Sequence, residues 1–358
     1  MRAHLVRAAL DQHGVAVRVV TTSHAGRAFL ASMGTPSQVL STGYAVAFDG
    51  GQNIDRAATD ACVLRYLLSG DHAARDLATL RSLSRGAALL VNDFHPLPLT
   101  MPRAMGVPVV HVYGTHLWEA IAHHFAGRIP ERFDRVTSTL ATALRDRAFG
   151  CIEHGLGDRD EQPVTARRFR LPSIVAAPAR PAADVRASLG ISSRQRLAAV
   201  YLNPHFRDPR LAADLERGLG RAGFRMHAVG EGLTARPGWR AHDASFNDVA
   251  AAADVLVSAP GMGALAAWSH FGTPLLALRT DQPEQTANLR YLLTAQATPH
   301  AVLDAATATP EVIEHALTRL AYTLRGPRPD PVRAAKAVHA RWAETFCSLL
   351  SSHALHVT

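Results

Sequence analysis

The chain has 358 residues, of which 47% are hydrophobic and 19% charged, and this composition is typical of a globular protein with room for two domains. The net charge of +8 comes almost entirely from arginine, since Lys336 is the only lysine. It fits either a dispersed basic surface or a basic face for nucleotide phosphates or anionic lipid headgroups. No dense Lys/Arg run occurs and only 6% of the residues are aromatic, so we expect no nucleic-acid partner.

The three cysteines, Cys62, Cys151 and Cys347, lie far apart and form neither a disulfide framework nor a zinc pattern. No run of about 18 uncharged apolar residues occurs, which predicts no transmembrane helix. Charged residues interrupt the N-terminal segment, which predicts no signal peptide. We therefore expect a cytoplasmic protein, with peripheral contact at the inner face of the membrane left open.

The first elements predicted in chain order are a helix and then a strand, in MRAHLVRAALDQHGVAVRVVTT, residues 1–22. A doubly wound domain normally begins with a strand that becomes central in its sheet. Here that first strand and its glycine turn are missing. Two explanations stay open: either the true start lies upstream, where the DNA would encode about ten residues of apolar strand, or the domain has lost this strand.

Short apolar runs alternate with helix-like segments along the rest of the chain, which predicts parallel sheets with helical crossovers. The predicted strands are Val15–Thr22, Ala87–Phe94, Val107–Gly114, Arg196–Pro204, Arg225–Gly232, Ala253–Pro260 and Pro274–Thr280. A proline-rich segment, Leu171–Gly190, is the predicted linker. We expect two Rossmann-like doubly wound α/β domains facing a cleft, residues 1–180 and 181–330, and a last helix in 331–358 that packs back on the first domain.

The most informative stretch is SAPGMGALAAWSHFGTPLLALRTDQPEQTANLRYL, residues 258–292. Gly261, Met262 and Gly263 form a turn at the end of a predicted strand, and the helix that follows offers unpaired N–H groups and its positive dipole end to a phosphate. After the next strand, a polar loop supplies side chains that can bind sugar hydroxyls in pairs; these are Asp281, Gln282, Glu284, Gln285 and Asn288. A glycine turn alone can also be a plain helix cap.

This stretch resembles the donor-binding region of GT-B glycosyltransferases, a group that includes the bacterial peptidoglycan N-acetylglucosaminyl transferase, the UDP-glucuronosyl-type transferases and macrolide glycosyltransferases. The matching features are the glycine-rich turn, the G-x-P at Gly272–Pro274 and the Q-x-x-N at Gln285–Asn288. The resemblance is clear over residues 243–293 and weaker at Asn92–Leu97 and His4–Arg7. It implies donor binding by residues 181–330 and acceptor binding by residues 1–180.

One departure from the family pattern concerns the ribose. The family usually has a glutamate five residues before the glycine of G-x-P, where this chain has Ala267. Three interpretations stay open: another residue such as Glu284 replaces it, the donor is unusual, or transferase activity has been lost.

The resemblance places a catalytic base at His4, because the family has a histidine after its first glycine turn and a histidine titrates near neutrality. An exposed histidine near the terminus is the alternative. Asp93 and His95 follow a predicted strand, so Asp93 could assist the base and His95 could bind the acceptor, although Asp93 could simply cap the next helix. His116, Glu119 and His123 share a helical face, which fits acceptor contact better than zinc.

In the second domain, Asn203 and His205 follow a predicted strand and would lie under the donor phosphates or sugar, and Phe246 would flank the base. We expect a metal-independent, inverting transferase that needs no cofactor, because the nucleotide sugar is its substrate. Its partner would be a hydroxyl acceptor, either lipid-linked or a small metabolite. The alternatives are a sugar-nucleotide epimerase and a non-catalytic or degenerate GT-B binding protein.

Overall fold

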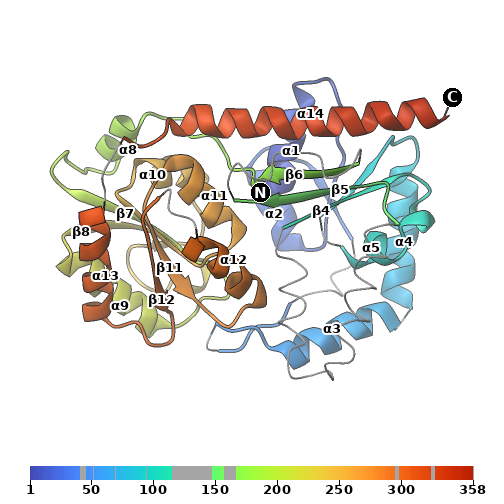
Figure 1. Cartoon of the computed structure of the whole chain (residues 1–358). Coiled ribbons are helices and arrows are strands. Elements are labelled where there is room, and N and C mark those ends of the chain that lie inside the picture. Colours follow the sequence, from blue (N-terminus) through green and yellow to red (C-terminus); the bar gives the residue numbers. More distant parts are fainter. Residues whose placement is uncertain are drawn as a thin grey trace. The chain divides into compact units, whose positions relative to one another are not determined.

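The computed structural model describes residues 1–40, 46–50, 52–68, 70–93, 95–114, 147–156, 167–294, 298–323 and 327–357. These residues form two compact units (Figure 1). Unit 1 comprises Met1–Ala47, Asp55–Ile174 and Val338–Thr358, and unit 2 comprises Phe48–Ile54 and Val175–Ala337. The short segment Phe48–Ile54 therefore belongs to unit 2, although unit 1 surrounds it in sequence. No helix in the described ranges is both long and apolar enough to cross a membrane.

Unit 2 is built on one parallel sheet of six strands in the order β12-β11-β10-β7-β8-β9. The strands are β7 (Arg196–Tyr201), β8 (Phe224–Val229), β9 (Trp239–Arg240), β10 (Val255–Ser258), β11 (Leu275–Arg279) and β12 (His300–Asp304). The two central strands, β7 and β10, are buried along almost their whole length, as expected for strands covered on both faces. The strand order reverses between them, because later strands add outward in both directions from this pair.

Helices connect the strands of unit 2. They are α8 (Ala182–Ser188), α9 (Pro209–Arg221), α10 (Phe246–Ala252), α11 (Met262–Phe271), α12 (Pro283–Thr294) and α13 (Pro310–Thr323), with a 3-10 turn, η4, at Glu231–Leu233. Asp208 caps α9 by accepting from the Arg210 N–H at 2.8 Å, and Pro209 follows at the first helical position, where its missing N–H costs nothing.

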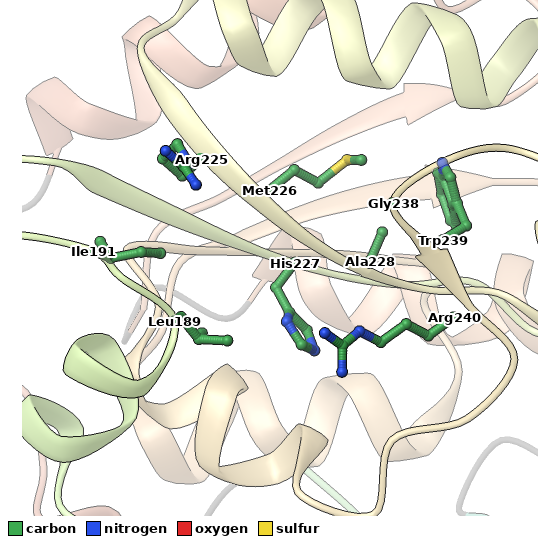
Figure 2. Close-up of a pocket in the computed structure, with 9 residues that line it drawn as sticks. All are labelled: Leu189, Ile191, Arg225, Met226, His227, Ala228, Gly238, Trp239 and Arg240. Carbon is green, nitrogen blue, oxygen red and sulfur yellow. The ribbon is translucent and has the colours of Figure 1, made fainter.

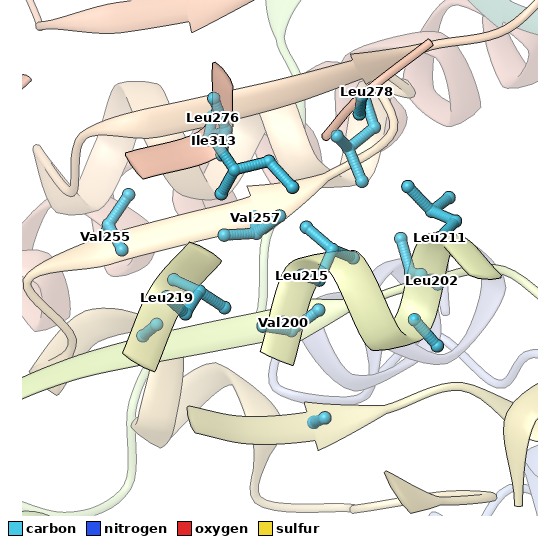
Figure 3. Packing of buried hydrophobic residues seen from close by; sticks show 14 of the residues in the cluster. Val200, Leu202, Leu211, Leu215, Leu219, Val255, Val257, Leu276, Leu278 and Ile313 are labelled. Atoms are coloured by element: carbon cyan, nitrogen blue, oxygen red, sulfur yellow. The ribbon is translucent and has the colours of Figure 1, made fainter. Parts of the chain in front are cut away.

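The main core of unit 2 lies between the sheet and the pair α9 and α13. Figure 3 shows Leu211, Leu215 and Leu219 of α9 beside the aliphatic side chains of the central strands. The two helices approach closely at Gly218, where an added Cβ would lie 2.6 Å from the Ile313 Cγ2. This core fixes the strand ends from which the site loops leave.

Unit 1 is also built from strands and helices. Its elements are α1 (Arg2–Asp11), β1 (Val19–Thr21), α2 (His24–Ser32), β2 (Ser37–Val39), α3 (Arg56–Leu68), α4 (Asp71–Ser84), β3 (Leu90–Asn92), α5 (Pro96–Thr100), η1 (Pro102–Met105), β4 (Val109–Gly114), β5 (Gly150–Gly155) and β6 (Arg168–Pro172). The long helix α14 (Pro331–Val357) contributes its residues from Val338 onward to this unit. Trp342 of α14 is fully buried, and its indole N–H donates to the Pro172 carbonyl at 2.8 Å.

The strands of unit 1 form two separate parallel sheets, β1-β2 and β3-β4-β5-β6. Val20 of β1 and Leu90 of β3 pack against the same hydrophobic cluster, yet in the described residues no ladder joins their strands. In a doubly wound sheet, the first strand is central and pairs on both sides. In the described part of unit 1, β1 and β3 therefore belong to separate sheets that share one hydrophobic cluster.

Candidate functional site in unit 2

The reversal of strand order in unit 2 marks the expected place for a ligand. In open parallel sheets, ligands bind beyond the carboxyl ends of the strands, where the order reverses. In this unit that point lies between Tyr201, the last residue of β7, and Ser258, the last residue of β10. The Ser258 hydroxyl donates to the Tyr201 carbonyl at 2.8 Å, which ties the two strand ends together. We call this region, with the loops that leave it, the switch-point edge.

The glycine turn predicted from the sequence leaves the sheet at this edge. Gly261 is the N-cap of α11, with φ −77° and ψ 158°, and no side chain among the described residues caps the helix. An added Cβ at Gly261 or at Gly263 would meet no atom within 4 Å, so the space above the turn is open. Met262 between them is buried. The N-terminus of α11 thus faces open space with unpaired N–H groups and its positive dipole end, which suits a phosphate.

Gln285 and Asn288 hold the loops of this edge in place. The Asn288 amide donates to the Pro260 carbonyl at 2.9 Å, directly before the glycine turn. The Gln285 carbonyl oxygen accepts from the Thr280 hydroxyl at 3.0 Å and from its N–H at 3.3 Å. Both side chains are buried, 3% and 2% exposed. Their described contacts position the loops.

More accessible side chains line the same edge. Glu284 is exposed in the first turn of α12, and Asn203, half-buried after β7, has no side-chain hydrogen bond within the described ranges. His205 and Gln282, from two different loops, lie 2.6 Å apart through their Nε2 atoms. Burial lowers the pKa of His205 to about 4, so its ring is neutral near pH 7 and can accept from the Gln282 amide.

The segment Phe48–Ile54 is a site element that the sequence did not predict. Phe48 and Ile54 form an antiparallel bridge, and the Phe48 ring stacks on His205 with centroids 4.3 Å apart and planes at 6°. The Asn53 side chain accepts from the Asp281 N–H at 2.9 Å. This hairpin therefore holds both loops of the predicted sugar side. Only the Asp-Gly-Gly of residues 49–51 hints at a turn, and nothing in it signals where the turn docks.

Aromatic side chains and one alanine occupy the positions predicted for the nucleoside. Phe246, at the start of α10, lies 5.4 Å from Tyr201 between ring centroids. Burial, with a smaller contribution from the charge of Glu231, raises the pKa of Tyr201, which keeps its hydroxyl protonated. Ala267 is 5% exposed on α11 and offers no hydrogen-bonding group to a ribose.

The residues predicted for catalysis lie in unit 1, and the structure does not pair them with each other. The His4 Nδ1 lies 2.8 Å from the Thr35 hydroxyl. Desolvation and then the nearby N-terminal ammonium lower the pKa of His4, so its ring is neutral near pH 7. The Asp93 carboxylate forms an ion pair with Arg2 instead of supporting His4.

His95 has a structural contact of its own. Its Nδ1 accepts from the Leu97 N–H at 3.3 Å and so caps α5, and burial lowers its pKa. His116, with Glu119 and His123, lies outside the described residues.

Comparisons with known proteins support the architecture. No family model matches the chain, and no curated protein sequence matches it. Among solved structures, the spinosyn forosaminyltransferase SpnP matches with a TM-score of 0.59 at 16% identity, over 99% of this chain and 94% of that one. Arabidopsis thaliana UGT89C1, complexed with UDP, matches with a TM-score of 0.61 at 13% identity, over 99% and 96%.

The glycosyltransferase VinC, in complex with dTDP, matches with a TM-score of 0.55 at 16% identity, over 99% of this chain and 96% of that one. All three structural matches cover both units of the chain. The chain therefore has the two-domain α/β fold of GT-B glycosyltransferases, and the predicted fold class is confirmed.

Proposed function

We propose that this protein is a glycosyltransferase that moves a sugar from a nucleoside-diphosphate sugar to a hydroxyl acceptor. The observation that carries the proposal is the open space above Gly261 and Gly263, at the N-terminus of α11 and at the switch point of the unit 2 sheet. The UDP and dTDP complexes of structures with this fold support a nucleoside diphosphate as the ligand class.

Unit 2 would bind the donor. The N-terminus of α11 would bind the pyrophosphate and stabilise its charge as it leaves, and for this reason we propose that the transfer is metal-independent. Asp281, Gln282 and Glu284 would bind the sugar hydroxyls, with Glu284 also available to the ribose in place of the missing glutamate. Gln285 and Asn288 would act by positioning these loops.

Unit 1 would supply the acceptor side. With its Nδ1 bonded to Thr35, the neutral His4 has Nε2 left to accept the proton of an acceptor hydroxyl. Direct attack by that hydroxyl on the anomeric carbon would invert its configuration. Asp93, paired with Arg2, would orient Arg2 rather than His4, and His95 and His116 remain candidates for acceptor contact.

A second candidate function is non-catalytic binding of a nucleotide or nucleotide sugar, and Ala267 favours it because the usual ribose partner is absent. One assay separates the candidates: the full chain is incubated with UDP-, dTDP- and GDP-sugars and a panel of hydroxyl acceptors. Products are identified by mass spectrometry, and the anomeric configuration by NMR. Glycosylated acceptor supports the transferase, an isomerised donor supports an epimerase, and donor binding without either product supports the binding protein.

A further inference from the structure

A pocket of about 430 Å³ opens at the side of the unit 2 sheet, next to β8 and β9 (Figure 2). It is lined by Leu189, Ile191, Arg225, Met226, His227, Ala228, Gly238, Trp239 and Arg240. In the sheet, β8 and β9 lie on the other side of β7 from the glycine turn. The pocket also reaches Arg225 at the beginning of β8, whereas ligands at the switch-point edge lie beyond the strand ends. It is therefore distinct from the glycine turn and adjoins the predicted nucleoside side, where the His227 and Phe246 ring centroids lie 6.5 Å apart.

Three basic side chains project from one face of the sheet into this pocket. Arg225 and His227 share a face because side chains alternate along β8. Arg240 of β9 pairs in register with Val229, which puts it on the same face as His227. Figure 2 shows the His227 ring and the Arg240 guanidinium reaching toward the same side of the strands.

The positive charge of the two arginines is not neutralised locally. Both are exposed, and neither guanidinium has a hydrogen bond or ion pair with another residue in the part of the chain that the structure describes. None of the nine lining residues carries a carboxylate. The carboxylate held against the pocket, Asp243, is already engaged, because it lies 2.7 Å from the His227 Nε2 and accepts from the Ser245 N–H and hydroxyl at 2.8 and 2.7 Å.

The rest of the lining is apolar. Leu189 is half-buried and Ile191 buried, so a ligand would find hydrocarbon surface beside the two guanidinium groups, whereas Met226 and Trp239 pack on the other face of the sheet. The volume falls within the range of small-molecule sites, about 300–1,000 Å³. An inorganic anion would leave most of this surface uncovered.

From this combination we infer a second ligand site in unit 2, for a small organic anion with an apolar body, in which Arg225 and Arg240 bind the anionic head. Charge-assisted hydrogen bonds from guanidinium groups to carboxylate, sulfonate or phosphate oxygens supply the recognition. His227, held by Asp243, supports the head from the same face. The inference does not depend on the transferase activity, because none of these residues belongs to the switch-point edge.

The test uses 8-anilinonaphthalene-1-sulfonate, a fluorescent sulfonate with an aromatic body, titrated into the full chain. The variants Arg225→Gln and Arg240→Gln should each raise its Kd about tenfold, which is the expected loss of one charge-assisted contact. The matched control is Arg319→Gln, an exposed arginine of α13 outside the pocket, which should leave the Kd within about twofold. Thermal melting of each variant checks that it is folded.

Two further measurements define the site. The uncharged analogue N-phenyl-1-naphthylamine should bind at least about tenfold more weakly than the sulfonate, because it has the body without the head. UDP at saturating concentration should leave the Kd of the sulfonate unchanged. The inference is overturned if wild type does not bind the sulfonate, or if the pocket variants bind it unchanged or no more weakly than Arg319→Gln. It is also overturned if the uncharged analogue binds equally well, or if UDP displaces the sulfonate.

Discussion

Replacing Gly261 with valine should separate ligand binding from folding at the glycine turn. The backbone of Gly261, at φ −77° and ψ 158°, is one that valine adopts, and an added Cβ meets no atom within 4 Å. The free energy of unfolding should then decrease by only about 1 kcal/mol, because a branched residue is a weaker N-cap than glycine. For a domain of this size, that lowers Tm by about 2–4 °C.

The expected binding cost of Gly261→Val is larger. The two methyl groups would fill the space where a pyrophosphate approaches the N–H groups of α11. Losing one or two charge-assisted hydrogen bonds, at about 1.5–3 kcal/mol each, raises the Kd for UDP or dTDP about 10- to 100-fold or more. Calorimetric titration measures the Kd, and differential scanning calorimetry measures Tm on the same preparations.

Gly272 provides the matched control in the same segment. It ends α11 in the left-handed region at φ +64°, and an added Cβ would lie 2.5 Å from the Pro329 Cδ. Gly272→Ala should therefore lower Tm by more than Gly261→Val does and leave the Kd of the folded protein unchanged. A Gly261→Val protein that binds UDP and dTDP as tightly as wild type would refute our interpretation of the turn as a phosphate site.

Three more predictions concern the hairpin, the pH dependence of stability and metal ions. Phe48→Ala removes the ring stacked on His205 beside the sugar-side loops. KM for the nucleotide sugar should therefore rise about tenfold, while the Kd of the free nucleoside diphosphate stays constant. An equal rise in KM and in this Kd would mean that the hairpin supports nucleotide binding instead. Burial lowers the pKa of His111 to about 4. Because the unfolded chain takes up this proton at a pH near 6.5, His111 by itself should lower the free energy of unfolding by about 3 kcal/mol from pH 6.5 to 4. In His111→Gln the fall measured in denaturant-unfolding curves should be smaller than in wild type by this amount. Asp158 and Asp160, outside the described residues, have the Asp-x-Asp spacing of metal-dependent sugar transferases. We nevertheless expect turnover to persist in EDTA. Loss of turnover in EDTA that Mg²⁺ or Mn²⁺ restores would contradict the metal-independent mechanism.

In unit 2, the fold was predictable where strands are buried on both faces, whereas the buried strand β5 of unit 1, which reads GCIEHG, was not predicted. The runs that became β7, β10 and β11 are rich in aliphatic residues, and their pattern alone indicates parallel strands. The edge strands could not be predicted in this way. β9 has only two residues, and β12, which reads HAVLD, is half-exposed along its length. Edge strands need less apolar surface, so hydrophobic patterning does not mark them.

The sequence predicted which segments meet at the candidate site but not the contacts of their side chains. The turn at Gly261 and the loop after β11 meet at one edge because carboxyl ends of parallel strands share an edge. Residue types could not show that Gln285 and Asn288 turn inward to backbone groups, nor that Asp93 pairs with Arg2. Such outcomes depend on which of several polar partners lies nearest after folding, and this is a property of tertiary packing.

The most direct test of the proposed donor site is calorimetric titration of the full wild-type chain with UDP and with dTDP. We expect saturable one-site binding of at least one of them, with the Kd raised at least about tenfold in Gly261→Val and unchanged in Gly272→Ala. The absence of measurable binding to either nucleotide at millimolar concentration, by a protein that still melts cooperatively, would contradict a nucleoside-diphosphate site at the switch-point edge.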